Sequence, residues 1–400
     1  MTLSPTVWAR IRDGQSPTPP LVDRVLDDDA VVLGADGIRR ARADLAADVL
    51  GAGPLEPLLH DPQVTDVLVN GSAEVWVDRG AGLLRAHCPL GDDQAVRRLA
   101  VRLAGLCGRR LDDTCPYVDG LLPGGARLHA MLPPLAVGGP YISLRVPRQQ
   151  APSLVDLQSW GTFAEPWLPV LRAIVARRCA FVVSGGTGSG KTTLLGALLA
   201  EVDPVERIVL VEDVRELMIR HPHVVRLQSR PPNVEGRGEI TMTALVRQSL
   251  RMRPDRLVVG EVRGGEVREL LTALNTGHEG GCGTMHANTS VDVVARFEAL
   301  GALAELGPAA VHAQLRSAVS VVVHVRRLAA GPDVPTGGTG RVGRVLETIG
   351  VVQASGVDQR VEIVPALERR RDGSIGQGPG WPTLAKQLDL DPVTSIGGHR

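Results

Sequence analysis

The stretch Ala180-Phe-Val-Val183 runs directly into Ser184-Gly-Gly-Thr-Gly-Ser-Gly-Lys-Thr-Thr193. The first four residues are apolar, as in a buried strand, and the residues after Thr193 have a helical pattern. Between them, Gly185–Thr192 matches the pattern G-x-x-x-x-G-K-[ST] in the strand, loop and helix context that this pattern requires. The stretch therefore predicts a phosphate-binding loop within an α/β fold.

The residue types of this loop follow from the chemistry of phosphate binding. Glycines let backbone N–H groups curl around phosphate oxygens, and the following helix adds the positive end of its dipole. Lys191 is expected to reach the β- and γ-phosphates, and the Thr192 hydroxyl is expected to bind Mg²⁺. The residues predicted to hold the nucleotide are Gly185, Gly186, Thr187, Gly188, Ser189, Gly190, Lys191, Thr192 and Thr193.

The composition makes the lysine of this loop stand out. Of 400 residues, 44 are basic and 44 acidic, and subtracting the two lysines, Lys191 and Lys386, leaves 42 arginines. With lysine so rare, a chance match to the pattern is improbable. The zero net charge and the low aromatic content argue against a general nucleic-acid binder, which usually has a basic excess and stacking platforms.

Neither a disulfide framework nor a membrane span is expected. The five cysteines are an odd number without C-x-x-C spacing, which favours a reducing compartment. No window approaches the roughly 18 uninterrupted apolar residues of a membrane helix, and charged residues interrupt the first 14 residues, where a signal peptide would be apolar. The sequence predicts a cytoplasmic protein with at most peripheral membrane contact.

The sequence pattern divides the chain into four parts. Residues 1–52 are a Pro-rich extension that ends in a helical stretch, and residues 53–147 combine one helix with hairpin-forming strands in a small α+β domain. Residues 148–169 read as a linker, since Pro147 to Pro169 holds four prolines and little periodicity. Residues 170–400 alternate apolar strands with helices, which predicts a mostly parallel sheet covered on both faces, followed by a weakly structured tail.

Individual elements are expected from turn signals and periodicity. In the first domain, strands are expected within 66–71, 74–78, 120–132 (a hairpin) and 141–146, and a helix at 92–107. In the second domain, strands are expected at 180–183, 208–211, 224–227, 257–259 and 320–325, and helices at 192–202, 242–252, 266–275 and 291–300. A Gly/Pro loop at 329–340 and weaker β segments at 342–352 and 361–364 complete the expectation.

Two carboxylates stand at the ends of apolar strands, Glu212 after 208–211 and Glu261 after 257–259. In an open α/β sheet the carboxyl ends of the strands face the ligand. One carboxylate there suits Mg²⁺ and the second suits orienting the attacking water, although each alone is equally compatible with a capping or solvated acid. Adenine is the expected base, because guanine-specific loops need Asn-Lys-x-Asp and Lys386 follows Ala385.

The segment 277–288, Gly-His-Glu-Gly-Gly-Cys-Gly-Thr-Met-His-Ala-Asn, is dense in glycine and holds two histidines. His278, Cys282 and His286 together leave a metal site open, but their spacing fits no standard zinc pattern. Imidazoles beside a phosphate site more often donate hydrogen bonds. We therefore expect a polar phosphate-sensing segment here rather than a metal centre.

In this order, the motifs resemble those of the secretion ATPases, the hexameric motors of type II and type IV secretion and type IV pilus assembly. The four motifs are Walker A (185–192), the Asp box (211–213), Walker B (259–264) and the His box (276–288). The likeness is strongest to the Tad/Flp pilus, CpaF-like branch and extends over about residues 45–330, including Asp66–Gly71, Arg127–Ala130, Ile142–Arg145 and Pro231–Gly236. It implies a RecA-like P-loop ATPase domain behind the N-terminal α+β domain.

The resemblance also implies a role for each motif residue. Glu212 would activate water, and Glu261 would be the Walker-B acid at Mg²⁺. His286 and His278 would sense the γ-phosphate. Many members of the family have serine at the position of Cys282, a departure that leaves these roles unchanged.

Two arginines of the N-terminal domain, Arg127 and Arg145, match arginines that close over the phosphates in the secretion ATPases. An arginine fork suits this task because it binds phosphate oxygens in pairs. A surface arginine is nearly as good an interpretation of each, because the chain is so rich in arginine.

The resulting hypothesis is an ATPase that needs ATP and Mg²⁺ and powers pilus assembly or protein secretion. The resemblance implies a homohexamer that works on inner-membrane platform proteins, at the inner face of the cytoplasmic membrane, without direct contact with nucleic acid. One alternative is a conjugation or DNA-uptake ATPase of the same fold. A nucleotide-gated scaffold that does not hydrolyse ATP is the other.

Overall fold

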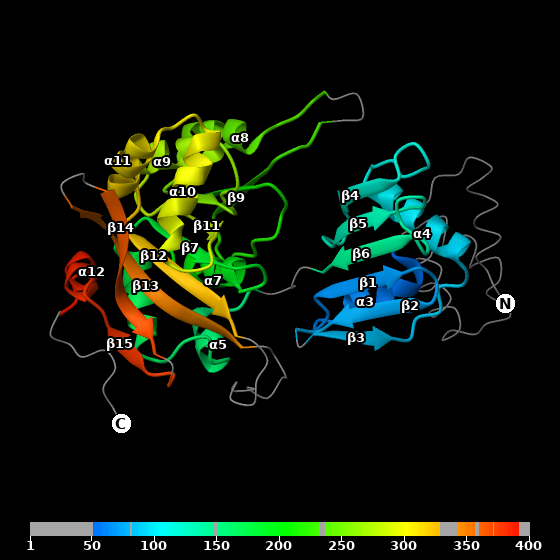
Figure 1. The fold of residues 1–400 in the computed structure, drawn as a ribbon, viewed down its shortest axis with the longest axis horizontal. Helices are drawn as coiled ribbons and strands as arrows, with labels where there is room; N and C mark the ends of the chain where they lie inside the picture. Colours follow the sequence, from blue (N-terminus) through cyan, green and yellow to red (C-terminus); the bar gives the residue numbers. More distant parts are fainter. Residues whose placement is uncertain are drawn as a thin grey trace. The chain divides into compact units, whose positions relative to one another are not determined.

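The computed structural model describes residues 51–80, 82–146, 151–232, 237–328, 343–356, 360–370 and 372–391. The chain divides into two compact units, Met1–Gln149 and Gln150–Arg400, which are described separately (Figure 1). The helix expected at the end of the 1–52 extension, the loop expected at 329–340 and the residues 233–236 of the Pro231–Gly236 segment lie outside the described residues.

The N-terminal unit is built on an antiparallel six-stranded sheet of order β3-β2-β1-β6-β5-β4. Its strands are β1 (Asp66–Asn70), β2 (Glu74–Asp78), β3 (Leu83–Ala86), β4 (Tyr117–Leu121), β5 (Arg127–Met131) and β6 (Tyr141–Arg145); its helices are η1 (Gly53–Leu55), α3 (Glu56–His60) and α4 (Asp93–Leu106). The expected hairpin of β1 and β2 is confirmed, since Gly71 after β1 has a φ of 69°.

Helix α4 covers the sheet because its apolar residues recur on one face. Val96, Leu99 and Leu103 are buried in one core with the inward-facing Val67 and Val69 of β1. Asp92 begins the helix as predicted, accepting a hydrogen bond of 2.8 Å from the backbone N–H of Ala95. The unit is thus a two-layer α+β structure.

The second unit has a nine-stranded sheet of order β15-β14-β13-β12-β7-β11-β10-β8-β9. From β12 to β9 neighbouring strands are parallel, and β13, β14 and β15 extend the sheet in antiparallel fashion. The strands are β7 (Phe181–Gly185), β8 (Ile208–Glu212), β9 (Val224–Gln228), β10 (Arg256–Val259), β11 (Cys282–His286), β12 (Val321–Arg327), β13 (Arg344–Ser355), β14 (Arg360–Arg369) and β15 (Ile375–Gln377).

Helices cover both faces of this sheet, each over its own apolar core (Figure 1). One core includes α5 (Leu154–Ser159), α6 (Trp167–Ala176), α7 (Lys191–Leu199) and α12 (Trp381–Leu388). The other includes α8 (Met242–Ser249), α9 (Glu266–Asn275), α10 (Asp292–Leu303) and α11 (Pro308–Ala318), with η2 (Leu250–Met252) after α8. The strands between them are almost continuously buried, as expected for a parallel sheet covered on both sides.

Three segments differ from the sequence-based expectation. The segment 148–169 contains α5, whose Leu154 and Leu157 are buried in the core. Within residues 372–391, the tail that was expected to be weakly structured contains α12, and Trp381, Leu384 and Leu388, at helical spacing, bury one face of it. The glycine-dense segment 277–288 contains β11, a strand in the middle of the sheet.

The glycines of β11 are there because neighbouring strands and helices approach closely. A Cβ on Gly283 would lie 2.7 Å from the carbonyl oxygen of Val259 on β10. Glycine is depleted in strands generally, so its density hid a strand that depends on it for packing.

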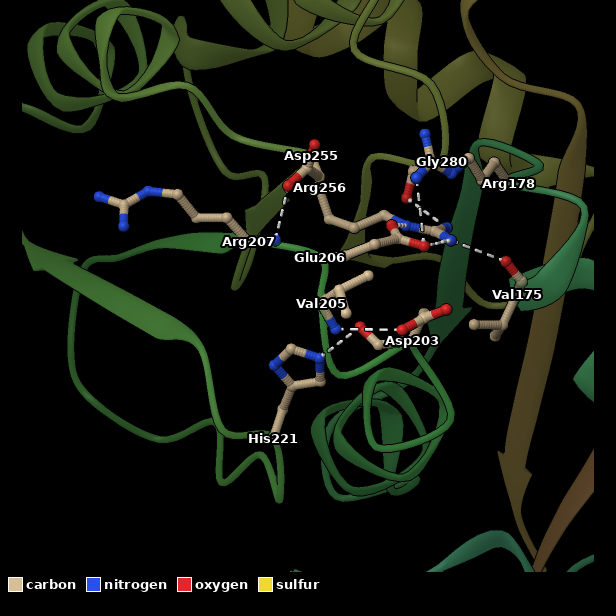
Figure 2. Close-up of polar contacts among 10 residues, drawn as sticks. All are labelled: Val175, Arg178, Asp203, Val205, Glu206, Arg207, His221, Asp255, Arg256 and Gly280. Carbon is tan, nitrogen blue, oxygen red and sulfur yellow. Dashed lines mark hydrogen bonds and ion pairs between the residues drawn. The ribbon is translucent and has the colours of Figure 1, made fainter.

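Arg256, the first residue of β10, forms a buried ion pair with Glu206 (Figure 2). Arg256 is 2 % exposed and donates from Nε to Oε2 of Glu206 over 2.6 Å and from Nη2 to Oε1 over 3.2 Å. The same guanidinium donates to the carbonyl of Val175 at the end of α6 (2.9 Å) and to that of Gly280 before β11 (3.4 Å). Arg256 therefore joins α6, β10 and the loop before β11.

No helix among the described segments is long and apolar enough to cross a bilayer.

Candidate nucleotide site

The loop between β7 and α7 has the conformation that a phosphate-binding loop needs. Gly188 and Gly190 have φ values of 70° and 97°, which side-chain-bearing residues rarely adopt. A Cβ on Gly186 would meet no atom within 4 Å, so the loop is open at this residue. Helix α7 begins at Lys191, and its N-terminal dipole end therefore lies at the loop.

Lys191 lies across its own loop rather than in solvent. It is 7 % exposed, and its Nζ donates to the carbonyl of Gly186 over 3.0 Å. Burial lowers the pKa of Lys191, although the carboxylate of Glu261 opposes this shift. A phosphate group would supply the negative charge that favours the buried ammonium.

The order of the strands brings three motifs together. Strand β11 lies between β7 and β10, so His286 at its end stands between the loop and the Walker-B segment. Nε2 of His286 is 3.4 Å from Nζ of Lys191 and 2.8 Å from Oε1 of Glu261, whose other oxygen pairs with Arg263. Burial, and then Lys191, lower the pKa of His286.

Glu212 lies at the end of β8, beside this group, but its carboxylate is already bound. Its Oε1 accepts the backbone N–H groups of Glu216 (3.0 Å) and Leu217 (2.7 Å), and its Oε2 is 3.6 Å from Arg226. The residue is buried, and burial raises its pKa. The geometry makes Glu212 the anchor of the turn after β8; its role in activating water stays a prediction.

The residues present fit a nucleotide with Mg²⁺. Oγ of Ser189 is buried and makes no hydrogen bond to the described residues, which suits a donor meant for a phosphate oxygen. The Thr192 hydroxyl and the Glu261 carboxylate are hard oxygen ligands of the kind that Mg²⁺ prefers, and both stand at the same edge of the sheet. Thr187 and Thr193 complete the predicted loop.

One predicted residue of this unit lies away from the loop. His278 precedes β11, and because Cys282 aligns with Phe181 at the start of β7, this residue lies at the opposite edge of the sheet from the loop. Its Nδ1 is 3.2 Å from the carbonyl of Ala273. His278 thus lies before the first residue of β11 and His286 is its last residue, and the role of His278 in sensing phosphate stays a prediction.

Arg127 and Arg145 belong to the N-terminal unit, where they are direct neighbours. They are register partners on β5 and β6. Nε of Arg145 is 3.2 Å from Oδ1 of Asp66 on β1. The structure thus brings the two arginines together on one sheet, and their contact with phosphates stays a prediction.

Sequence reasoning missed several polar residues around the loop. Arg263 pairs with Glu261, and Glu216 adds negative charge near both Lys191 and Arg263. Nε of Arg344 donates to the carbonyl of Gly188 over 2.9 Å. Arg263 lies inside the Walker B motif and Glu216 three residues after the Asp box, which was an available signal. Arg344 is 156 positions from Gly188 and had none.

Two sequence relatives have names that refer to conjugal transfer. A Mycobacterium tuberculosis protein, provisionally named as a conjugal transfer protein, is 56 % identical over 293 residues, which cover 72 % of this chain and 83 % of the relative. The conjugal transfer protein TrbB of Rhizobium radiobacter is 33 % identical over 286 residues, covering 69 % and 83 %.

A solved structure agrees with the fold. The pilus retraction motor PilT with bound ADP is 20 % identical, covers 76 % of this chain and 83 % of its own, and has a TM-score of 0.53. At this identity the likeness concerns the fold, and the predicted RecA-like α/β unit behind an N-terminal domain is confirmed.

The family model described as "Type II/IV secretion system protein" matches residues 48–370. This match covers most of the chain, including both units and every motif discussed above. The chain belongs to the type II/IV secretion system protein family.

Proposed function

We propose that this protein is an ATP-hydrolysing motor of a secretion or pilus-assembly machine, with the Tad/Flp type as the expected pathway. The observation that carries the proposal is the convergence of Lys191, His286 and Glu261 at the mouth of one glycine loop. Membership of the secretion family supports the context in which ATP would be used.

Each residue has a task in this proposal. The loop N–H groups, Ser189 and Lys191 hold the phosphate chain. Thr192 and Glu261 would hold Mg²⁺, which supplies neutralisation of phosphate charge when bound. His286, which is next to both Lys191 and Glu261, would sense the γ-phosphate. Glu212 fixes the turn that carries Glu216, and one of the two carboxylates orients the water.

The assembly is part of the proposal. We infer a homohexamer at the inner face of the cytoplasmic membrane, acting on membrane platform proteins, with Arg127 and Arg145 assisting at the phosphates. The resemblance and the family match support this arrangement. Light scattering on the purified chain with ATP and Mg²⁺ tests the ring, and equal turnover by wild type, Arg127→Ala and Arg145→Ala would remove the arginines from the mechanism.

The central experiment measures phosphate release by the purified chain with ATP and Mg²⁺. We expect turnover that disappears without Mg²⁺ and in Glu261→Gln, while ATP binding persists in that variant. Binding without any turnover in the wild type would instead support the nucleotide-gated scaffold.

A second candidate is an ATPase that powers conjugal DNA transfer. The relatives from Mycobacterium tuberculosis and Rhizobium radiobacter favour it, because both carry conjugal transfer names. Deleting the gene in its host and measuring pilus display and plasmid transfer in parallel distinguishes the two pathways. Lost pili with normal transfer supports the first candidate, and the reverse supports the second.

A further inference from the structure

Two arginines from the C-terminal part of the chain lie next to the phosphate loop. Arg327 is the last residue of β12 and Arg344 the first of β13. Arg344 donates to the carbonyl of Gly188, and its Cδ is 3.3 Å from the position that a Cβ on Gly190 would take. Nη1 of Arg327 is 3.5 Å from the corresponding position on Gly188.

A β-bulge sets this pair opposite one another. On β12 and β13, His324 aligns with Thr348, and continuing that register would place Val345 opposite Arg327. The register shifts by one residue between His324 and Val325, so Arg344 aligns with Arg327 instead. Bulges beside active sites commonly redirect a side chain in this way.

Two like charges directly opposite each other on neighbouring strands destabilise a sheet. Among the described residues, no acidic side chain forms an ion pair with Arg327. The nearby carboxylate of Glu347 is bound to Arg326, with Nε to Oε1 at 2.9 Å. An anion beside the loop would convert the repulsion into attraction.

We propose that Arg327 and Arg344, which lie against Gly188 and Gly190, bind the phosphate chain of the nucleotide together with Lys191. The proposal rests on the proposed function, since it needs the loop to hold a nucleoside polyphosphate. A guanidinium carries five N–H donors, so the bond from Arg344 to Gly188 is compatible with a bond to phosphate. Arginine suits the site because its planar fork matches phosphate oxygens.

The chain offers a matched control in Arg326. It is adjacent to Arg327 on the same strand and equally cationic, yet it pairs with Glu347 instead of reaching the loop. Arg326→Ala therefore removes one positive charge from the same hairpin without touching the proposed contact.

The experiment is calorimetric titration of the full chain with ATP, ADP and inorganic tripolyphosphate. We expect Arg327→Ala and Arg344→Ala each to lower the affinity for all three ligands by about tenfold, because each variant loses a charge-assisted bond to phosphate. Arg326→Ala should bind like wild type. Without nucleotide, the melting temperature of Arg327→Ala should equal or exceed that of wild type, because a repulsion is removed.

The possible failures are distinguishable. If wild type binds none of the ligands, the proposed function fails. If wild type binds and Lys191→Ala does not, but both arginine variants bind like wild type, only this inference is overturned. An unchanged affinity for tripolyphosphate in the arginine variants would also overturn it, and so would an equal loss of affinity in Arg326→Ala. A loss of affinity in Arg344→Ala alone would overturn it too, because Arg344 would then only stabilise the loop through Gly188.

Discussion

The parallel strands of the nine-stranded sheet begin at one edge and end at the opposite edge, and the buried cations at these two edges are bonded differently. At the edge where β10 begins, Arg256 forms hydrogen bonds with Glu206 and with two carbonyl groups, so its guanidinium is bound by groups of the protein itself (Figure 2). At the other edge, Lys191 has only the Gly186 carbonyl and the imidazole of His286 within hydrogen-bond distance among the described residues, and Ser189 Oγ is buried without a partner.

This difference separates charges that hold the fold from charges that hold a ligand. A buried ion pair with all its bonds made within the protein is sensitive to removal of either partner. A buried cation without a carboxylate bonded to it gains little from the fold alone and much from an anionic ligand. The comparison would fail if a substitution at the Lys191 edge mainly lowered stability, or if one at the Arg256 edge mainly weakened ATP binding.

The largest effect is expected from Lys191→Ala. Removing a cation placed toward phosphate charge should lower the rate by about 10²–10³ and weaken binding in addition, so that kcat/KM for ATP falls more than about a thousandfold. The free energy of unfolding without nucleotide should not fall, because the lost cation is buried with its pKa lowered. A steady-state assay and urea denaturation check both parts; a large loss of stability would contradict the comparison.

The second effect concerns the carboxylates after β8. General base catalysis contributes at least about a hundredfold, so the variant that lacks the base should lose that factor in kcat while still binding ATP. Because the resemblance to the secretion ATPases implies that Glu212 activates water, we expect this loss in Glu212→Gln, and Glu216→Gln is the matched control. If Glu216→Gln loses turnover and Glu212→Gln mainly loses stability, the base is Glu216 and Glu212 only anchors the turn.

The third effect is on stability. Arg256→Ala leaves the carboxylate of Glu206 buried with Arg178 (Nη2 to Oε1, 3.4 Å) as its remaining partner. We expect a loss of about 3–5 kcal/mol in the free energy of unfolding, measured by urea denaturation. The folded fraction should bind ATP as wild type does. Arg247→Ala, which breaks the ion pair of an exposed arginine with Glu269, is the control and should leave the free energy of unfolding close to that of wild type.

The smallest effect is expected at Cys282, at the same edge as Arg256. Burial raises the pKa of this thiol to about 12 from an ordinary value of 9.0, so the folded state holds its proton more tightly. Its contribution to stability is present below pH 9 and is lost as the pH rises toward 12. At pH 8, iodoacetamide should leave Cys282 unmodified in the folded chain while labelling the partly exposed Cys115, as read by peptide mass spectrometry. Rapid native labelling of Cys282 would show that this edge opens.

Much of the site could be predicted because its residues belong to short motifs with a fixed spacing in the sequence. The glycine loop, Lys191 and Glu261 follow from short motifs next to apolar strands, and the alternation of strands and helices predicts the layers. The order of the strands does not follow from these patterns. The position of β11 between β7 and β10, parallel to both, places His286 next to the loop and His278 before the other end of the strand.

The remaining gaps have one physical cause, which is contact between residues far apart in sequence. Gly283 reads as a loop residue until the carbonyl of Val259 is seen to leave no room for a Cβ. Arg344 is one of 42 arginines until a bulge turns it toward Gly188. The apolar spacing of Trp381, Leu384 and Leu388, by contrast, was present in the sequence and would have predicted α12.

The near-absence of lysine has a practical consequence for covalent labelling. The chain has two side-chain amines, one nearly buried in the phosphate loop and one exposed on α12 at Lys386. An acylating reagent therefore has one lysine that a bound nucleotide would shield and one that it would not. The ratio of the two modified peptides in a mass spectrum would report nucleotide occupancy directly, with Lys386 as the internal standard.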